Sequence, residues 1–193
     1  MKTRSIRGDM TTLLLVCLMI SGIVCWEVLG APDDALLGSR HIDALGSYWF
    51  QWFVAHQVDL GSSLSQTDLW FHPWGIDILQ TYGGNIIDPL IALPFRAMGG
   101  PVFAWNALVF LILLTNGVSA GAWLRVRTGT VLAASAAASI AILHPIALND
   151  LAQGRPAQAI LAPLIGALAL FDSSNRCEDL RRSRWLAFGS GLC

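Results

Sequence analysis

Long apolar runs alternate with one long mixed stretch along the chain. The first run, residues 10–30, is about 20 residues long, which is enough for a helix to cross roughly 30 Å of hydrocarbon. Residues 31–100 contain no run of that length and mix acids, aromatics, prolines and glycines. Three further apolar runs follow at 101–124, 130–148 and 157–171. The pattern predicts an all-α, polytopic transmembrane protein with four complete spans and a long helical loop after the first span.

Composition favours a membrane protein over a soluble one. Hydrophobic residues make up 54% of the chain and charged residues 13%, whereas soluble domains average about 25% charged residues. The net charge of −1 gives no reason to expect nucleic-acid binding. The four cysteines show neither metal-binding spacing nor a disulfide framework. Membrane lipid is therefore the first expected partner, and a secreted soluble protein is excluded by the apolar runs.

The basic residues predict how the chain is oriented. Residues 1–9, the turn at 125–128 and the loop 173–184 together hold nine of the twelve Lys and Arg residues. These segments share one side of the membrane if the first run and the region 101–172 supply the four spans. Basic residues gather on the cytoplasmic side. The N-terminus is therefore predicted to be cytoplasmic, and residues 31–100 are predicted to form an extracytoplasmic loop.

The last residues, 185–193, are expected to begin a fifth span. The stretch "WLAFGSGLC" is apolar but only nine residues long, far short of the roughly 20 that a span needs. The chain is therefore interpreted as the front portion of a larger protein, completed by a missing C-terminal portion or by a partner chain.

The stretch "HIDALGSYWFQWFVAH", residues 41–56, sets one acid beside five aromatic residues. Tyr and Trp favour the membrane–water interface, so a helix in or near the outer interface is predicted here. Two roles remain open for Asp43: a helix N-cap, or a carboxylate that faces an external cavity and takes part in chemistry.

Four other residues outside the predicted spans are candidates for substrate binding. Asp34 follows the first span closely and is either a rival acid or a helix cap. His72 and Asp77 flank a Pro-Trp-Gly turn and either contact substrate or stabilise the turn. Arg155, in "QGRPAQ", has the forked donors that suit a lipid phosphate, and the alternative is snorkelling to a headgroup. The histidines show no metal spacing with one another.

The order of these features resembles the GT-C class of membrane glycosyltransferases, which use sugars linked to polyprenyl phosphate. "DALGSYW" at 43–49 is similar in place to the D-P-x-x-x-Y-R motif of the oligosaccharyltransferase catalytic subunit, with Trp49 where the motif has Arg. "LWFHPWGIDILQTYGG" at 69–84 resembles the W-Y-P-x-G and T-x-Y-P-G-like stretches of that subunit, and "NIIDPLIALP" at 85–94 resembles N-x-x-D-x-L-x-A-L-P of bacterial relatives. The resemblance covers roughly residues 10–172.

The resemblance implies a function and a role for each candidate. The chain would transfer a sugar from a polyprenyl-phosphate carrier to an extracytoplasmic acceptor, in a bacterial inner membrane. Asp43 would act as general base or help hold a divalent metal ion, and Arg155, Asp34, His72 and Asp77 would contact substrate. The alternative is a non-catalytic multi-span protein or a transporter component. The acids avoid the predicted spans and gather in one external loop, which favours an external site over a transport path.

Overall fold

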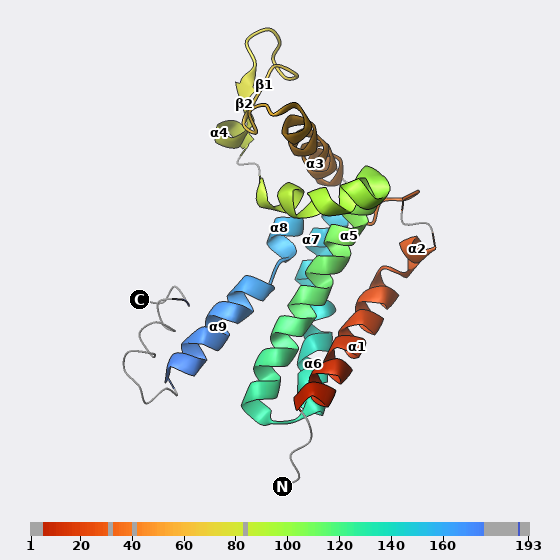
Figure 1. Ribbon diagram of the computed structural model, residues 1–193, viewed down its shortest axis with the longest axis vertical. Helices are drawn as coiled ribbons and strands as arrows, with labels where there is room; N and C mark the ends of the chain where they lie inside the picture. The colour runs from red at the N-terminus through yellow and green to blue at the C-terminus, as the bar shows by residue number, and fades with distance from the viewer. Residues whose placement is uncertain (1–5, 31–32, 40–41, 83–84, 176–188, 190–193) are drawn as a thin grey trace. The chain divides into compact units, whose positions relative to one another are not determined.

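The computed structural model describes residues 6–30, 33–39, 42–82, 85–175 and 189, and almost all of its regular structure is helical. The predicted all-α fold is therefore confirmed. Apart from residue 189, the expected fifth span at 185–193 lies outside the described residues, as does most of the predicted basic loop. The helices are α1 (Ile6–Val24), α2 (Trp26–Leu29), α3 (Ile42–Leu60), α4 (Ile78–Tyr82), α5 (Ile87–Thr128), α6 (Val131–Ile142), α7 (Pro145–Gln153), α8 (Pro156–Ala159) and α9 (Ala162–Asn175) (Figure 1). Two short strands, β1 (Gln66–Thr67) and β2 (Ile76–Asp77), pair antiparallel.

Three helical segments of the described chain are long and apolar enough to cross a membrane, and the chain is accordingly a membrane protein. They are Ile87–Thr128, Val131–Gln153 and Pro156–Asn175. The first predicted span is shorter than expected: its apolar helical part is Gly8–Val24, because the helix breaks at Cys25 before the single turn of α2. Four complete spans were predicted, and three helical segments of the described chain are long enough to cross a membrane.

The chain forms two compact units. Unit 1 contains residues 1–24, 111–148 and 159–193, and unit 2 contains residues 25–110 and 149–158. Most of α3 to α5 and the segment around Arg155 belong to unit 2, so the candidate residues of the long loop fall in one unit.

Close helix packing holds unit 1 together. Helices α1 and α6 run side by side. Two glycines one turn apart on α5 leave room for a side chain of α1 and a side chain of α6. A Cβ atom at Gly121 would lie 2.4 Å from Cδ1 of Leu13, and one at Gly117 would lie 2.5 Å from Cδ1 of Ile142. Small residues at such positions let helices approach closely in a membrane, where packing rather than the hydrophobic effect drives association.

Within unit 1, the buried side-chain amide of Asn116 on α5 binds the backbone between α8 and α9. Its Nδ2 donates to the carbonyl of Ala159 at 2.8 Å, and its Oδ1 accepts from the amides of Leu161 (2.8 Å) and Ala162 (3.0 Å). These backbone groups lie at a break between two helices and would otherwise lack partners. Asn116 is therefore a structural residue whose polar atoms are satisfied.

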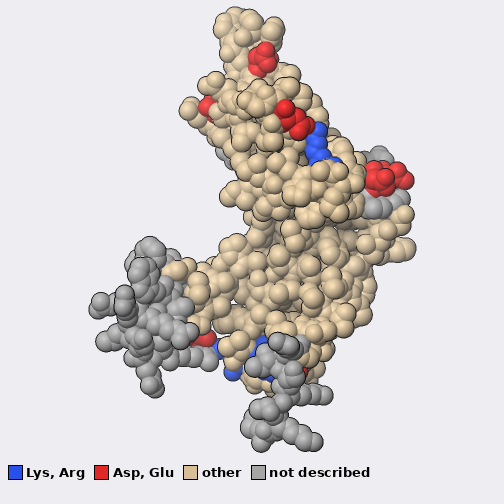
Figure 2. Space-filling view, viewed as in Figure 1, with Lys and Arg blue, Asp and Glu red and all other residues tan. Residues whose placement is uncertain are grey.

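Charged residues of unit 1 meet at one end of its helices. Arg125 on α5 forms an ion pair with Asp9 on α1, and Arg127 pairs with Asp172 on α9. Figure 2 shows blue and red atoms together at this end. The start of α1, the end of α5 and the end of α9 therefore share one end of unit 1, as the predicted topology requires.

Helix α5 consists of two helices joined at Gly99 and Gly100, where the backbone is not helical. The part before the kink begins at Ile87, with Asp88 and Pro89 in its first turn, where proline is well tolerated. It runs in a clearly different direction from the part after the kink in Figure 1. Residues 87–98 therefore form a separate short helix, which carries Asp88 and belongs to unit 2.

The segment after α2 is fastened to α5 by side chains. Asn106 accepts from the amide of Leu37 at 2.8 Å and donates to the carbonyl of Ala35 at 2.7 Å, while Nε1 of Trp105 donates to the carbonyl of Leu37 at 2.8 Å. This clamp fixes the chain shortly before α3 begins.

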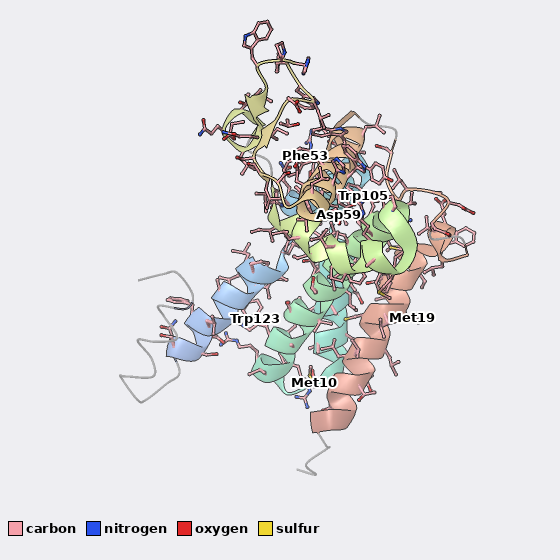
Figure 3. The ribbon with its side chains drawn as sticks, turned by 45° about the horizontal axis from the view of Figure 1, so that its top comes forward. Met10, Met19, Phe53, Asp59, Trp105 and Trp123 are labelled. Atoms are coloured by element: carbon pink, nitrogen blue, oxygen red, sulfur yellow. The ribbon has the colours of Figure 1, made fainter. Side chains whose placement is uncertain are left out.

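The aromatic residues of α3 build the interior of unit 2. Phe53 is fully buried with Val54 and Ile78, and partly buried neighbours, Trp49 among them, pack against this cluster. Figure 3 labels Phe53 on α3 and Trp105 on α5. The rings predicted to hold α3 at a membrane surface thus also form a protein core, which fixes the helix that carries Asp43.

Candidate functional site

Asp43 and Arg155 form an ion pair in unit 2. The Nε and Nη2 atoms of Arg155 lie 2.7 and 2.6 Å from Oδ2 of Asp43, although 112 residues separate the two in the chain. Their side chains are 37% and 39% exposed, so the pair is open to solvent and to a ligand. The two candidates that the sequence named separately are therefore brought together.

The backbone around the pair leaves little freedom. Gly154 has a φ of 81°, and a Cβ atom there would lie 2.1 Å from the Cα of Ala44. Nearby, the amide and hydroxyl of Ser39 donate to the carbonyl of Ala152 at 2.6 and 2.8 Å. Only glycine allows the residue before Arg155 to touch the first turn of α3 in this way. The fold therefore presses together the two segments that carry the ion pair.

Asp43 lies in the first turn of α3, which begins at Ile42, so it is not the N-cap residue. The expectation of an N-cap role is wrong, because that role requires a helix that begins at Ala44, two residues later than α3 does. An acid in the first turn is still favoured by the helix dipole. The carboxylate of Asp43 forms an ion pair with Arg155.

The ion pair lines a cavity of about 460 Å³ in unit 2. Three tryptophans line it as well, Trp49, Trp70 and Trp105, and the rings of Trp49 and Trp70 stack with centroids 4.9 Å apart. Apolar walls with a few placed polar groups are typical of small-molecule sites of about 300–1,000 Å³. The cavity therefore has the size and the lining of a ligand site.

Two buried polar side chains also line this cavity, and each has atoms without a hydrogen-bond partner. Gln51 is 7% exposed and Asp88 is 5% exposed. Both amide atoms of Gln51, and Oδ1 of Asp88, have no partner among the residues that the structure describes. Each such buried atom costs about 1–3 kcal/mol. Native proteins rarely keep three such atoms at one place without a reason, which makes these two residues part of the candidate site.

The remaining predicted substrate residues lie elsewhere. Asp77 lines a second, more open cavity of about 640 Å³ in unit 2, and its carboxylate caps α4 by accepting from the amide of Gln80 at 3.0 Å. His72 lies in an exposed turn where the amides of Trp74 and Gly75 donate to the carbonyl of Phe71. Asp34 is exposed and lines none of the described cavities. These three are not gathered with Asp43 and Arg155.

The described residues do not fit a metal site built from protein ligands alone. Within the ranges that the structure covers, no three His, Cys, Asp or Glu side chains come close enough to hold an ion. The divalent metal implied by the resemblance thus finds two carboxylates on the cavity wall, Asp43, which is already paired with an arginine, and Asp88.

The sequence did not identify Gln51 or Gly154 as part of a site, and it did not place Asp88 in a cavity. One signal was present for Gln51: Asp43, Ser47 and Gln51 repeat every four residues and so share one face of a helix. The role of Gly154 depends on contact with a segment more than a hundred residues away and leaves no local signal. No protein-family model matches the chain, and no curated protein or solved structure is significantly similar to it.

Proposed function

We propose that the chain belongs to a membrane glycosyltransferase of the GT-C kind, which moves a sugar from a polyprenyl-phosphate carrier to an extracytoplasmic acceptor. The observation that carries the proposal is the Asp43–Arg155 pair on the wall of a tryptophan-lined cavity. A carboxylate and an arginine are the two groups that this transfer needs side by side. The proposal places unit 2 on the extracytoplasmic side of a bacterial inner membrane.

The chemistry assigns one role to each member of the pair. Asp43 takes the proton of the acceptor hydroxyl as its oxygen bonds to the anomeric carbon of the sugar. The bond from that carbon to the phosphate oxygen breaks, and the phosphate leaves on its lipid. Arg155 neutralises the charge that develops on the phosphate. A guanidinium has five N–H donors, more than one carboxylate oxygen uses, so Arg155 can hold Asp43 and bind phosphate together.

The hydrogen bonds of two polar side chains in unit 1, Asn116 and His144, favour this function over a transport path. Polar residues of a transporter face a cavity near the middle of the membrane. The side-chain amide of Asn116 instead forms hydrogen bonds with three backbone groups. His144 lies between α6 and α7, where its Nδ1 accepts from the amide of Ala147 at 3.4 Å. Both residues therefore hold the helices together.

The test compares two aspartates of unit 2, each paired with an arginine. Asp43→Asn is expressed in the full protein in its host membrane, and transfer of labelled sugar from lipid carrier to surface glycan is measured. Loss of a general base lowers the rate by about 10²–10⁴-fold. The matched control is Asp59→Asn, because Asp59 pairs with Arg96 at 3.7 Å but lines none of the described cavities.

Retention of full transfer by Asp43→Asn, at the protein level of the unchanged chain, would show that Asp43 is not the base. Equal loss in both variants would point to a general effect of charge removal. Arg155→Gln should raise the KM for the lipid-linked donor more than Asp43→Asn does, because Arg155 is the group assigned to phosphate.

A further inference from the structure

The candidate cavity has two chemically different ends. Asp43 and Gln51 lie eight residues apart on the same face of α3, which corresponds to about 12 Å along a helix axis. The Asp43 end carries the ion pair with Arg155. The Gln51 end carries uncharged donor and acceptor atoms, with Asp88 of α5 lining the same cavity. A ligand that fills the cavity therefore meets a charged group at one place and, once Gln51 turns toward the cavity, a hydrogen-bonding group at another.

The unpartnered atoms define the ligand that suits the Gln51 end. The side-chain carbonyl of Gln51 and Oδ1 of Asp88 need donors, while the amide nitrogen of Gln51 needs an acceptor. Neighbouring hydroxyl groups supply both, because each hydroxyl donates once and accepts as well. The tryptophan rings nearby offer apolar faces to the C–H groups of such a ligand. A sugar ring combines these two properties.

We propose that Gln51 and Asp88 form a subsite that binds the hydroxyl groups of a hexose ring. The subsite deepens the proposed function, because it places a sugar about two helical turns from Asp43. The three polar atoms are closed to water in the structure. Binding therefore includes a rotation of the Gln51 side chain toward the cavity, driven by the partners that the hydroxyls provide.

The first measurement is binding of methyl glucoside, methyl mannoside and methyl galactoside to the purified full chain in lipid nanodiscs, followed by ligand-observed NMR. The variants are Gln51→Leu, which removes both unpartnered amide atoms, and Asp88→Asn, which keeps the side-chain shape. Gln57→Leu is the matched control, because Gln57 is another buried glutamine of α3 and does not line this cavity. Each site variant should weaken binding of at least one hexoside about tenfold, and the control should not.

Thermal unfolding of the same samples separates binding from structure. Gln51→Leu should keep or raise the melting temperature while losing the hexoside, because it removes buried atoms that lack partners. A lower melting temperature together with unchanged hexoside binding would give Gln51 a structural role and overturn the subsite. Absence of hexoside binding by the unchanged chain would overturn it as well.

Two further probes separate the subsite from the proposed function and identify the source of the sugar. Polyprenyl phosphate should bind equally to the unchanged chain and to Gln51→Leu, and more weakly to Arg155→Gln. Binding of hexosides without any binding of polyprenyl phosphate would keep the subsite and remove the glycosyltransferase. A hexose 1-phosphate that binds more tightly than its methyl hexoside through Arg155 would assign the subsite to the donor sugar, and equal binding would assign it to an acceptor sugar.

Discussion

The two units each contain an arginine–aspartate pair that joins distant parts of the chain, and the surroundings of the two pairs differ. Arg125 and Asp9 of unit 1 are 116 residues apart, and their side chains are 20% and 9% exposed. Arg155 and Asp43 of unit 2 are 112 residues apart and are 39% and 37% exposed. The first pair lies at the ends of packed helices, whereas the second lines a cavity with three tryptophans.

The difference shows that an ion pair takes its role from what surrounds it. Removing one partner from a buried pair leaves a charge without compensation, so the buried pair of unit 1 holds helices together. A pair more than a third exposed contributes little to stability. Its charges remain available to a ligand. The same two residue types thus serve structure in unit 1 and, as proposed, chemistry in unit 2.

The largest expected effect comes from breaking the backbone contact that makes the second pair possible. Gly154→Ala puts a Cβ atom 2.1 Å from the Cα of Ala44, in a backbone conformation that alanine rarely adopts. Overpacking and backbone strain together should lower the unfolding free energy by about 3–5 kcal/mol. Thermal unfolding in detergent measures this loss.

Gly46→Ala is the matched control for that substitution. Gly46 lies in α3 close to Ala44, and a Cβ atom there meets nothing within 4 Å. Alanine in the middle of a helix should then stabilise the protein by about 0.5–1 kcal/mol. If both variants unfolded at the same temperature, the pressed contact at Gly154 would not be what positions Arg155.

The second effect compares the two pairs directly. Asp9→Ala leaves the guanidinium of Arg125 largely buried without its partner and should cost about 2–3 kcal/mol. Asp43→Ala should cost less than about 1 kcal/mol, because both side chains of that pair are partly exposed. Thermal unfolding of the two variants and of the unchanged chain gives both numbers. A reversed order of the two losses would contradict the contrast drawn between the units.

The sequence predicted the all-α fold because long apolar runs permit little else in a membrane. It placed the helix boundaries less well. The run 130–148 was predicted as one span, and Val131–Gln153 is long and apolar enough to be one, but the sequence did not predict its interruption. Helix α6 ends at Ile142 and α7 begins at Pro145, since proline has no amide to continue the helix. The run 10–30 is interrupted at Cys25, where no residue of the stretch marks a break.

The candidate site could be predicted only in part for a similar reason. Asp43 stood out because an acid beside five aromatics is unusual, and Arg155 because few arginines lie outside the predicted cytoplasmic segments. Their pairing depends on contact across 112 residues, which no local pattern reveals. Asp34 and Asp77 are the same residue type in the same loop, yet neither lies beside the pair. The residue types suggested the chemistry, but only the fold showed which of these residues lie together in the candidate site.

The smallest expected effect is at the other described arginine–aspartate pair of unit 2, Arg96 and Asp59. Their closest atoms are 3.7 Å apart and the aspartate side chain is 68% exposed, so solvent screens the charges. Asp59→Asn should change the unfolding free energy by less than about 0.5 kcal/mol, and 1 M salt should remove even that difference. Sugar transfer should be unchanged, since Asp59 lines none of the described cavities. A loss of transfer in this variant, with stability preserved, would show that the functional surface of unit 2 extends beyond the tryptophan-lined cavity. Asp43 would then no longer differ from Asp59 in its effect on sugar transfer.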